Sequence, residues 1–89
     1  MHDFRAIALA AIKAQIEMLE EEAGVLFNQT SEHWDELAKI ERIYGEWMPP
    51  LAYCLFNWHL RQSQVCSTKY FHTRAAVAEL KRMIEEDSS

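Results

Sequence analysis

The feature that most constrains this chain is a pair of adjacent prolines, Pro49 and Pro50, that opens the most apolar run in the sequence. Proline lacks the amide hydrogen and clashes with the preceding helical turn, but it suits the first turn of a new helix. We therefore expect one helix to end just before the prolines and another to begin at Pro50. The new helix would be apolar around most of its circumference, which predicts that Leu51, Leu55 and Trp58 are buried among neighbouring helices.

Composition favours a single helical domain. The 89 residues include only two glycines and two prolines, so we expect few turns and long elements. The net charge is −5, made up of −6 over residues 1–50 and +1 over residues 51–89. An acidic protein is repelled by phosphate backbones, so we expect no direct nucleic-acid binding and instead a protein partner with a basic or apolar groove.

The termini and the cysteines predict a cytoplasmic setting. The chain begins without a basic leader, so we expect no signal peptide. The apolar run is too short to cross a bilayer, which needs roughly 20 residues, so we expect no membrane association. Cys54 and Cys66 are too few for a disulfide framework, and Cys54 within the apolar run is typical of a buried free thiol in a reducing compartment.

Helical periodicity predicts four helices in a single domain, residues 1–89. Apolar residues recur at steps of three and four from Phe4 onward, and an a/d pattern of a packing seam appears later in the chain. Thr30 or Ser31 suits a helix N-cap, as does Ser67 or Thr68. The predicted fold is all-α, a compact irregular four-helix bundle with helices at about 3–27, 31–47, 50–63 and 68–86. Whether the first helix ends at Gly24 or passes through it stays open.

Two carboxylate pairs could bind a metal ion. Glu17 with Glu20, and Glu32 with Asp35, are each spaced by three, so each pair points one way from its helix. Two helices could then offer four carboxylates to Mg²⁺. The spacing resembles the ExxE…ExxD pattern of the all-helical MazG-like nucleotide pyrophosphohydrolases, and this resemblance implies a Mg²⁺-dependent nucleotide hydrolase as the alternative function. The competing interpretation is a solvated acidic surface whose charges suit helix N-termini.

The cysteines and histidines give two further candidates. Cys54, His59, Cys66 and His72 have zinc-binding side chains, but closed zinc sites favour gaps of two to four residues within a ligand pair. Cys66 near a predicted helix start could be a reactive thiol, but no glycine-rich turn or oxyanion donor accompanies it. We therefore predict no cofactor, no metal site and no enzymatic activity.

The remaining pattern favours a protein-interaction module. Half of the aromatic residues lie between Tyr44 and Trp58. The ordinary interpretation of this cluster is a packed core, and the alternative is that a small bundle cannot bury all of it and leaves Trp47 and Tyr53 exposed as partner anchors. We predict a regulator, inhibitor or adaptor whose acidic helices imitate nucleic-acid charge, with a small structural subunit of a larger assembly as a second alternative. The expected partner-binding residues are Glu17, Glu20, Glu21, Glu32, Asp35, Glu36, Trp47 and Tyr53. The alanine row at residues 6, 10 and 14 also suggests a homodimer.

Overall fold

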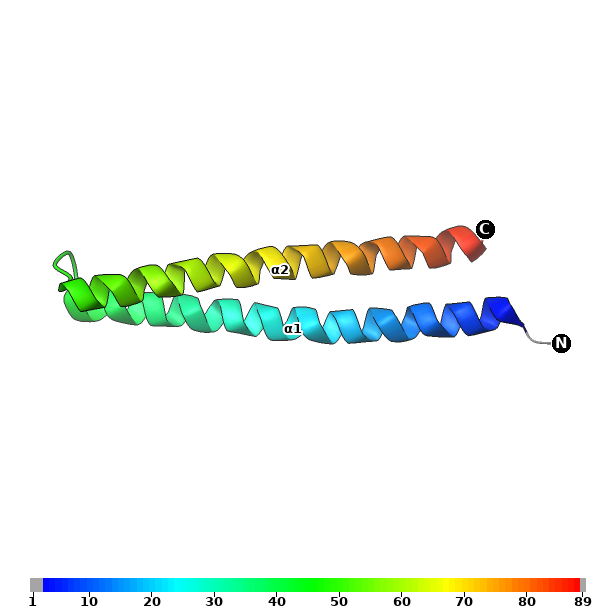
Figure 1. Cartoon of the computed structure of the whole chain (residues 1–89), viewed down its shortest axis with the longest axis horizontal. Coiled ribbons are helices and arrows are strands. Elements are labelled where there is room, and N and C mark those ends of the chain that lie inside the picture. The colour runs from blue at the N-terminus through cyan, green and yellow to red at the C-terminus, as the bar shows by residue number, and fades with distance from the viewer. Residues whose placement is uncertain (1–2, 89) are drawn as a thin grey trace.

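Two long antiparallel helices form the whole of the described chain. The computed structural model describes residues 3–88, with α1 at Phe4–Tyr44 and α2 at Pro50–Ser88. Figure 1 shows the helices side by side, joined by one short connection at one end, with both termini at the other end. The molecule is a helical hairpin about 70 Å long and 20 by 15 Å across.

Local chemistry fixes the ends of the helices. The Asp3 carboxylate accepts hydrogen bonds from the backbone N–H groups of Arg5 and Ala6 at 3.1 and 3.2 Å, so Asp3 is the N-cap of α1. Gly45 ends α1 with a φ of +59°, a conformation that residues with a Cβ adopt at a cost. Its N–H donates to the carbonyl of Glu41 at 2.7 Å. Pro50 begins α2, as the double proline predicted.

The all-α class is confirmed, but the four-helix bundle is wrong. The predicted helices 3–27 and 31–47 are both parts of α1, which passes through Gly24 and through the predicted loop at 28–31. Thr30 does not cap a helix there. Its hydroxyl donates to the carbonyl of Leu26 one turn earlier at 2.9 Å, a bond that a helix interior accommodates.

The second predicted loop is also helical. Residues 64–67 lie inside α2, which joins the predicted helices 50–63 and 68–86. This stretch contains no glycine or proline, and its one hydroxyl residue, Ser67, is only weakly unfavourable inside a helix. The neighbouring hydroxyls of Ser63 and Thr73 donate to the carbonyls of Leu60 and Lys69 within the same helix. Polar composition alone therefore did not break the helix.

One continuous seam holds the hairpin together. Its positions alternate by three and four along each helix without interruption, as in a coiled coil. Contacts between the helices follow an antiparallel order: Lys81 pairs with Glu20, Tyr70 with Phe27, and His59 with His33. The seam positions are Leu9, Ile12, Ile16, Leu19, Ala23, Leu26, Thr30, His33, Leu37 and Ile40 on α1, and Ala52, Phe56, His59, Ser63, Cys66, Tyr70, Thr73, Val77, Leu80 and Ile84 on α2.

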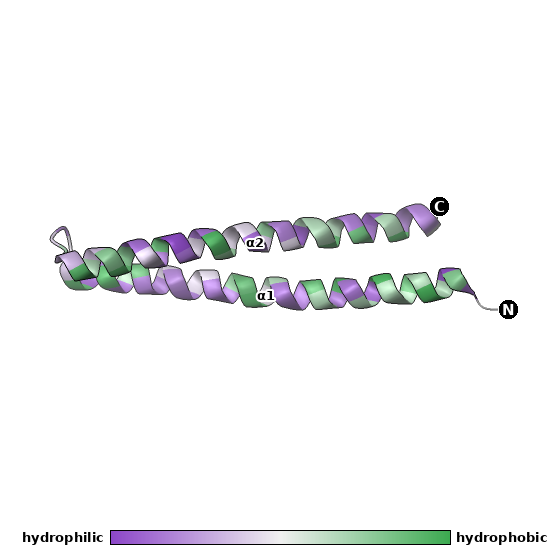
Figure 2. Cartoon of the chain, viewed as in Figure 1, coloured by the Kyte–Doolittle hydropathy of each residue, from purple (hydrophilic) through white to green (hydrophobic). Residues whose placement is uncertain are grey.

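The prediction that Leu51, Leu55 and Trp58 are buried is wrong. They are 85%, 48% and 51% exposed, because only one helix packs against α2 where three neighbours were expected. Figure 2 shows hydrophobic residues in several stretches along both helices, separated by hydrophilic stretches. Within residues 3–88, neither helix is long and apolar enough to span a membrane.

Candidate interaction surfaces

The middle of the seam is polar. Going along the hairpin, apolar layers give way to Thr30, His33, His59, Ser63 and Cys66, and Ser63 is the most deeply buried of these side chains at 1% exposure. Each polar group has a partner, and none of the buried side-chain nitrogen or oxygen atoms in the described part of the chain is left unpaired. Such layers add less burial than leucine or isoleucine would, but they disfavour shifted registers.

His33 and His59 face each other across the seam. Their Nδ1 atoms are 2.9 Å apart, so one ring donates its N–H and the other accepts through an unprotonated Nδ1. The indole of Trp58 meets both imidazoles edge-on, with ring centroids 5.7 Å from His33 and 5.0 Å from His59. The pair is thus a structural contact between the helices. His59 is the partly buried, hydrogen-bonded histidine that the sequence favoured over a zinc ligand.

The candidate zinc ligands do not come together. Cys54, His59, Cys66 and His72 all lie on α2, and the first and last are separated by about 27 Å of helix at 1.5 Å per residue. Within residues 3–88, no group of three or more histidine, cysteine, aspartate or glutamate side chains is placed to hold a metal ion. Cys54 is exposed and not buried as predicted, whereas Cys66 lies at the seam 3.8 Å from the Gln29 side-chain oxygen.

The acidic candidates all lie on α1. The two-helix arrangement that would bring Glu17 and Glu20 opposite Glu32 and Asp35 is not formed, because both pairs belong to one continuous helix. Residues 17 and 32 are about 22 Å apart along the axis. The acidic residues therefore form two groups along α1, one at residues 17–21 and the other at residues 32–36. Glu21 and Asp35 are two heptads apart, so they lie on one line that points away from α2, whereas the other four carboxylates point toward different sides of the helix.

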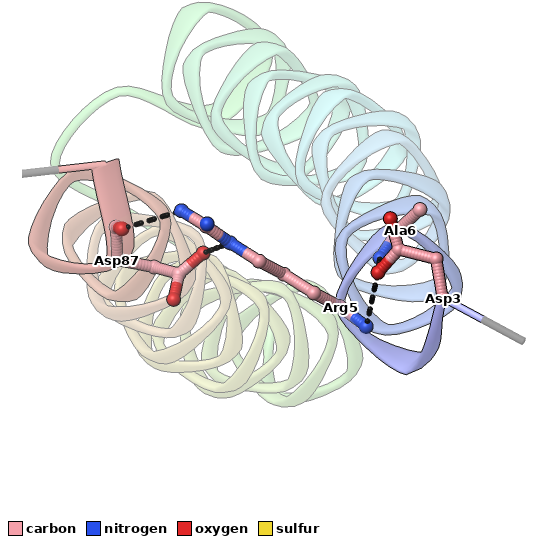
Figure 3. Close-up of polar contacts among 4 residues, drawn as sticks. All are labelled: Asp3, Arg5, Ala6 and Asp87. Carbon is pink, nitrogen blue, oxygen red and sulfur yellow. Dashed lines mark hydrogen bonds and ion pairs between the residues drawn. The ribbon is translucent and has the colours of Figure 1, made fainter. Parts of the chain in front are cut away.

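Within residues 3–88, two ion pairs link α1 to α2. Lys81 Nζ lies 2.9 Å from Glu20, and Arg5 Nε lies 2.9 Å from Asp87. Figure 3 shows the Arg5 guanidinium spanning the open end of the hairpin and also donating to the Asp87 carbonyl at 2.8 Å. All four side chains are substantially exposed, so each pair contributes only about 0–1 kcal/mol.

On the surface of α2, Arg82 is paired with Glu79 and Glu86. The hydrogen bond to the Glu79 carboxylate is the main cause that raises the pKa of Arg82 above its ordinary value, and the charge of Glu79 adds to the effect. Since arginine is already protonated at neutral pH, this shift changes no charge. These contacts support the helix locally.

The two aromatic candidates lie at the turn end of the hairpin. Trp47 is 82% exposed in the connection, and Tyr53 is 57% exposed in the first turns of α2. The residues of the alanine row, Ala6, Ala10 and Ala14, are exposed at the opposite end, near the start of α1. The predicted partner-binding residues therefore extend over most of the length of the molecule and do not form a single compact site.

No protein-family description, no curated protein and no solved structure matches this chain.

Proposed function

We propose that the protein is an interaction module that binds a larger protein and acts as a regulator, inhibitor or adaptor. One observation carries this proposal: sixteen large apolar or aromatic side chains among residues 3–88 are exposed on an elongated hairpin. Scattered exposed apolar residues are ordinary, but exposed tryptophans such as Trp34 and Trp47 are the side chains that most often anchor protein interfaces.

The shape of the molecule supports the same proposal. The Cα radius of gyration is 19.9 Å, whereas a compact domain of this length has about 12 Å. A rod of this kind can lie along a groove or along other helices, which is the usual way in which an amphipathic helix is recognised. Its extended sides give a partner more surface than a small globular domain would.

Charge narrows the kind of partner. Helix α1 carries eight acids and four bases, a net charge of −4, whereas α2 carries four acids and five bases, a net charge of +1. Glu21 and Asp35 lie on the outward line of α1, and neither forms an ion pair with another residue of the range 3–88. A groove that is basic along one wall and apolar at its base therefore complements this rod. A groove that normally binds nucleic acid is one partner of this kind.

The test is affinity capture from the source cells with three baits. The baits are the full chain, the isosteric variant Glu21→Gln/Asp35→Asn, and the control Glu85→Gln on α2, which also removes negative charge at an exposed position. We expect a larger protein that the wild type and the control retain and that the double variant loses, with the interaction then reproduced between purified proteins. If all three baits retain the same proteins, or none beyond the chain itself, the proposal is wrong.

A further inference from the structure

A second seam runs beside the first over residues 51–65 of α2 and ends where Lys69 and His72 take the next positions. Its members lie one residue before successive seam positions, so they point about 100° away from α1. Leu51, Trp58 and Val65 are 85%, 51% and 45% exposed there, and the spacing alternates by four and three as in the first seam. The members are Leu51, Leu55, Trp58, Gln62 and Val65. A helix with two adjacent heptad seams is typical of a bundle with more than two helices.

Several of the corresponding positions near the start of α1 are also apolar, although Gln15 and Glu22 between them are polar. Ala11, Met18 and Val25 each lie one residue before a seam position, and all three are exposed. The two sets share one broad side of the hairpin. Ala8 and Met83, which occupy the same kind of position on α1 and α2, line one groove of about 570 Å³ between the helices.

The opposite broad side is formed by residues that follow seam positions. Glu20 and Lys81 both occupy such positions, and they pair across the hairpin on that side. We use the name Trp58 face for the side with residues before seam positions, whose apolar members include Ala8, Ala11, Met18, Val25, Leu51, Leu55, Trp58, Val65 and Met83.

The hairpin exposes far more surface than a compact chain of its size. Its accessible surface is 7052 Å², whereas a 10.4 kDa compact monomer exposes about 5,400 Å². The excess is about 1,650 Å² per chain, and stable interfaces bury about 800 Å² or more on each partner. A broad side 70 Å long and 20 Å wide is large enough to supply this area.

The hairpin's own core is also thin. Among the described residues, the buried apolar side chains are Ile16, Ala23, Leu26, Leu37, Ile40, Ala52 and Val77, and two of these are alanines. The polar layers around His33, His59 and Ser63 occupy the middle of the seam. Chains of this size with so little buried surface commonly gain the rest of their stability by oligomerisation.

We propose that two copies of the chain pack Trp58 face against Trp58 face to form a four-helix homodimer. A second copy fits this face because the positions between its apolar residues carry both signs of charge, with Glu22, Glu32 and Glu36 against Lys39 and Lys69. Glu79 and Glu86 also lie at such positions and are already paired with Arg82. A two-fold interface places the same face on both sides, so opposite charges can pair across it. The dimer would use a different side of the hairpin from the outward line with Glu21 and Asp35. Its formation therefore does not depend on the identity of the larger partner.

Sedimentation equilibrium of the purified full chain tests the proposal. We expect a mass of twice 10.4 kDa for the wild type and a single-chain mass for Met18→Lys/Val65→Lys. The matched control is Phe71→Lys, because Phe71 is 65% exposed but follows a seam position on the opposite broad side. The control should stay dimeric. A monomeric wild type, a dimeric double variant, or a control that dissociates as readily as the double variant would overturn the proposal.

Tryptophan fluorescence gives a second measurement without introducing charge. Two chains each retain one tryptophan, either Trp58 or Trp34, with the other two replaced by phenylalanine. The two indoles are similarly exposed in the hairpin, at 51% and 55%, but Trp34 follows a seam position and lies off the Trp58 face. We expect the emission of Trp58 to shift to the blue as concentration rises and that of Trp34 to stay constant. Constant emission from Trp58, or a shift of Trp34 instead, contradicts the proposal.

Discussion

Replacing Asn28 with proline probes the continuity of α1. Asn28 is exposed and lies inside the helix, where proline removes the bond from its N–H to the carbonyl four residues earlier and clashes with that carbonyl. The cost of proline in a helix interior is about 3 kcal/mol or more. A chain of 89 residues has a free energy of unfolding of roughly 4–13 kcal/mol, so the loss is a large fraction of the total.

Thermal unfolding followed by circular dichroism measures this effect. At about 4–8 °C per kcal/mol for a domain of this size, the Asn28→Pro variant should melt roughly 12–24 °C below the wild type. The control Asn28→Ala should melt at the wild-type temperature or slightly above it, because alanine is the better helix former. If Asn28→Pro leaves the melting temperature unchanged, residues 28–31 form a loop after all and the hairpin is refuted.

Three more substitutions test the seam and the turn. Ile16→Ala at a buried seam position should lower the free energy of unfolding by about 2–4 kcal/mol, whereas the same change at exposed Ile7 should lower it by less than about 0.5 kcal/mol. Equal losses for the two variants in chemical denaturation would contradict the assigned seam. Gly45→Ala should destabilise by about 1 kcal/mol because of the positive φ at Gly45, and a more stable variant would show that the turn is misassigned. His59→Leu alone should destabilise the hairpin because it leaves the Nδ1 of His33 without its partner. The double variant His33→Leu/His59→Leu should restore or exceed wild-type stability, and a double-mutant cycle measures the difference.

The starts of the two helices were predictable because each depends on a few neighbouring residues, whereas α1 ends at Tyr44 and not at the predicted residue 47. Asp3 at the N-cap and the double proline at the start of α2 act through local chemistry. The predicted loops failed for a different reason. Asn28, Thr30 and Ser67 are residues of turns and caps, but they also occur inside helices at a modest cost.

The spacing of the seam positions indicates that the predicted loop at 28–31 is helical. The alternation by three and four passes through Ala23, Leu26, Thr30, His33 and Leu37 without a change of phase. A true loop would normally shift the phase of the next helix, so an unbroken register across polar residues indicates a single long helix. Because Thr30 and His33 are polar, a search for apolar residues alone does not find this continuity.

The exposed surface could not be predicted from single residues. Leu51, Leu55 and Trp58 have the composition of a buried helix, and the sequence does not state whether their neighbours come from the same chain. Under the proposed dimer these residues are covered by a second copy, so a bundle of four helices would arise from two chains. The acidic residues could be recognised in the sequence. That they lie in two separate groups follows only from the continuity of α1.

The distance between residues 7 and 43 tests the central claim most directly. Spin labels at Ile7→Cys and Ile43→Cys, with Cys54 and Cys66 replaced by alanine and the labelled chain diluted with unlabelled chain, report the distance within one molecule by pulsed electron paramagnetic resonance. A continuous α1 predicts about 54 Å between these positions. A chain folded back at residues 28–31 would place them roughly 20 Å apart, and that result would contradict the hairpin.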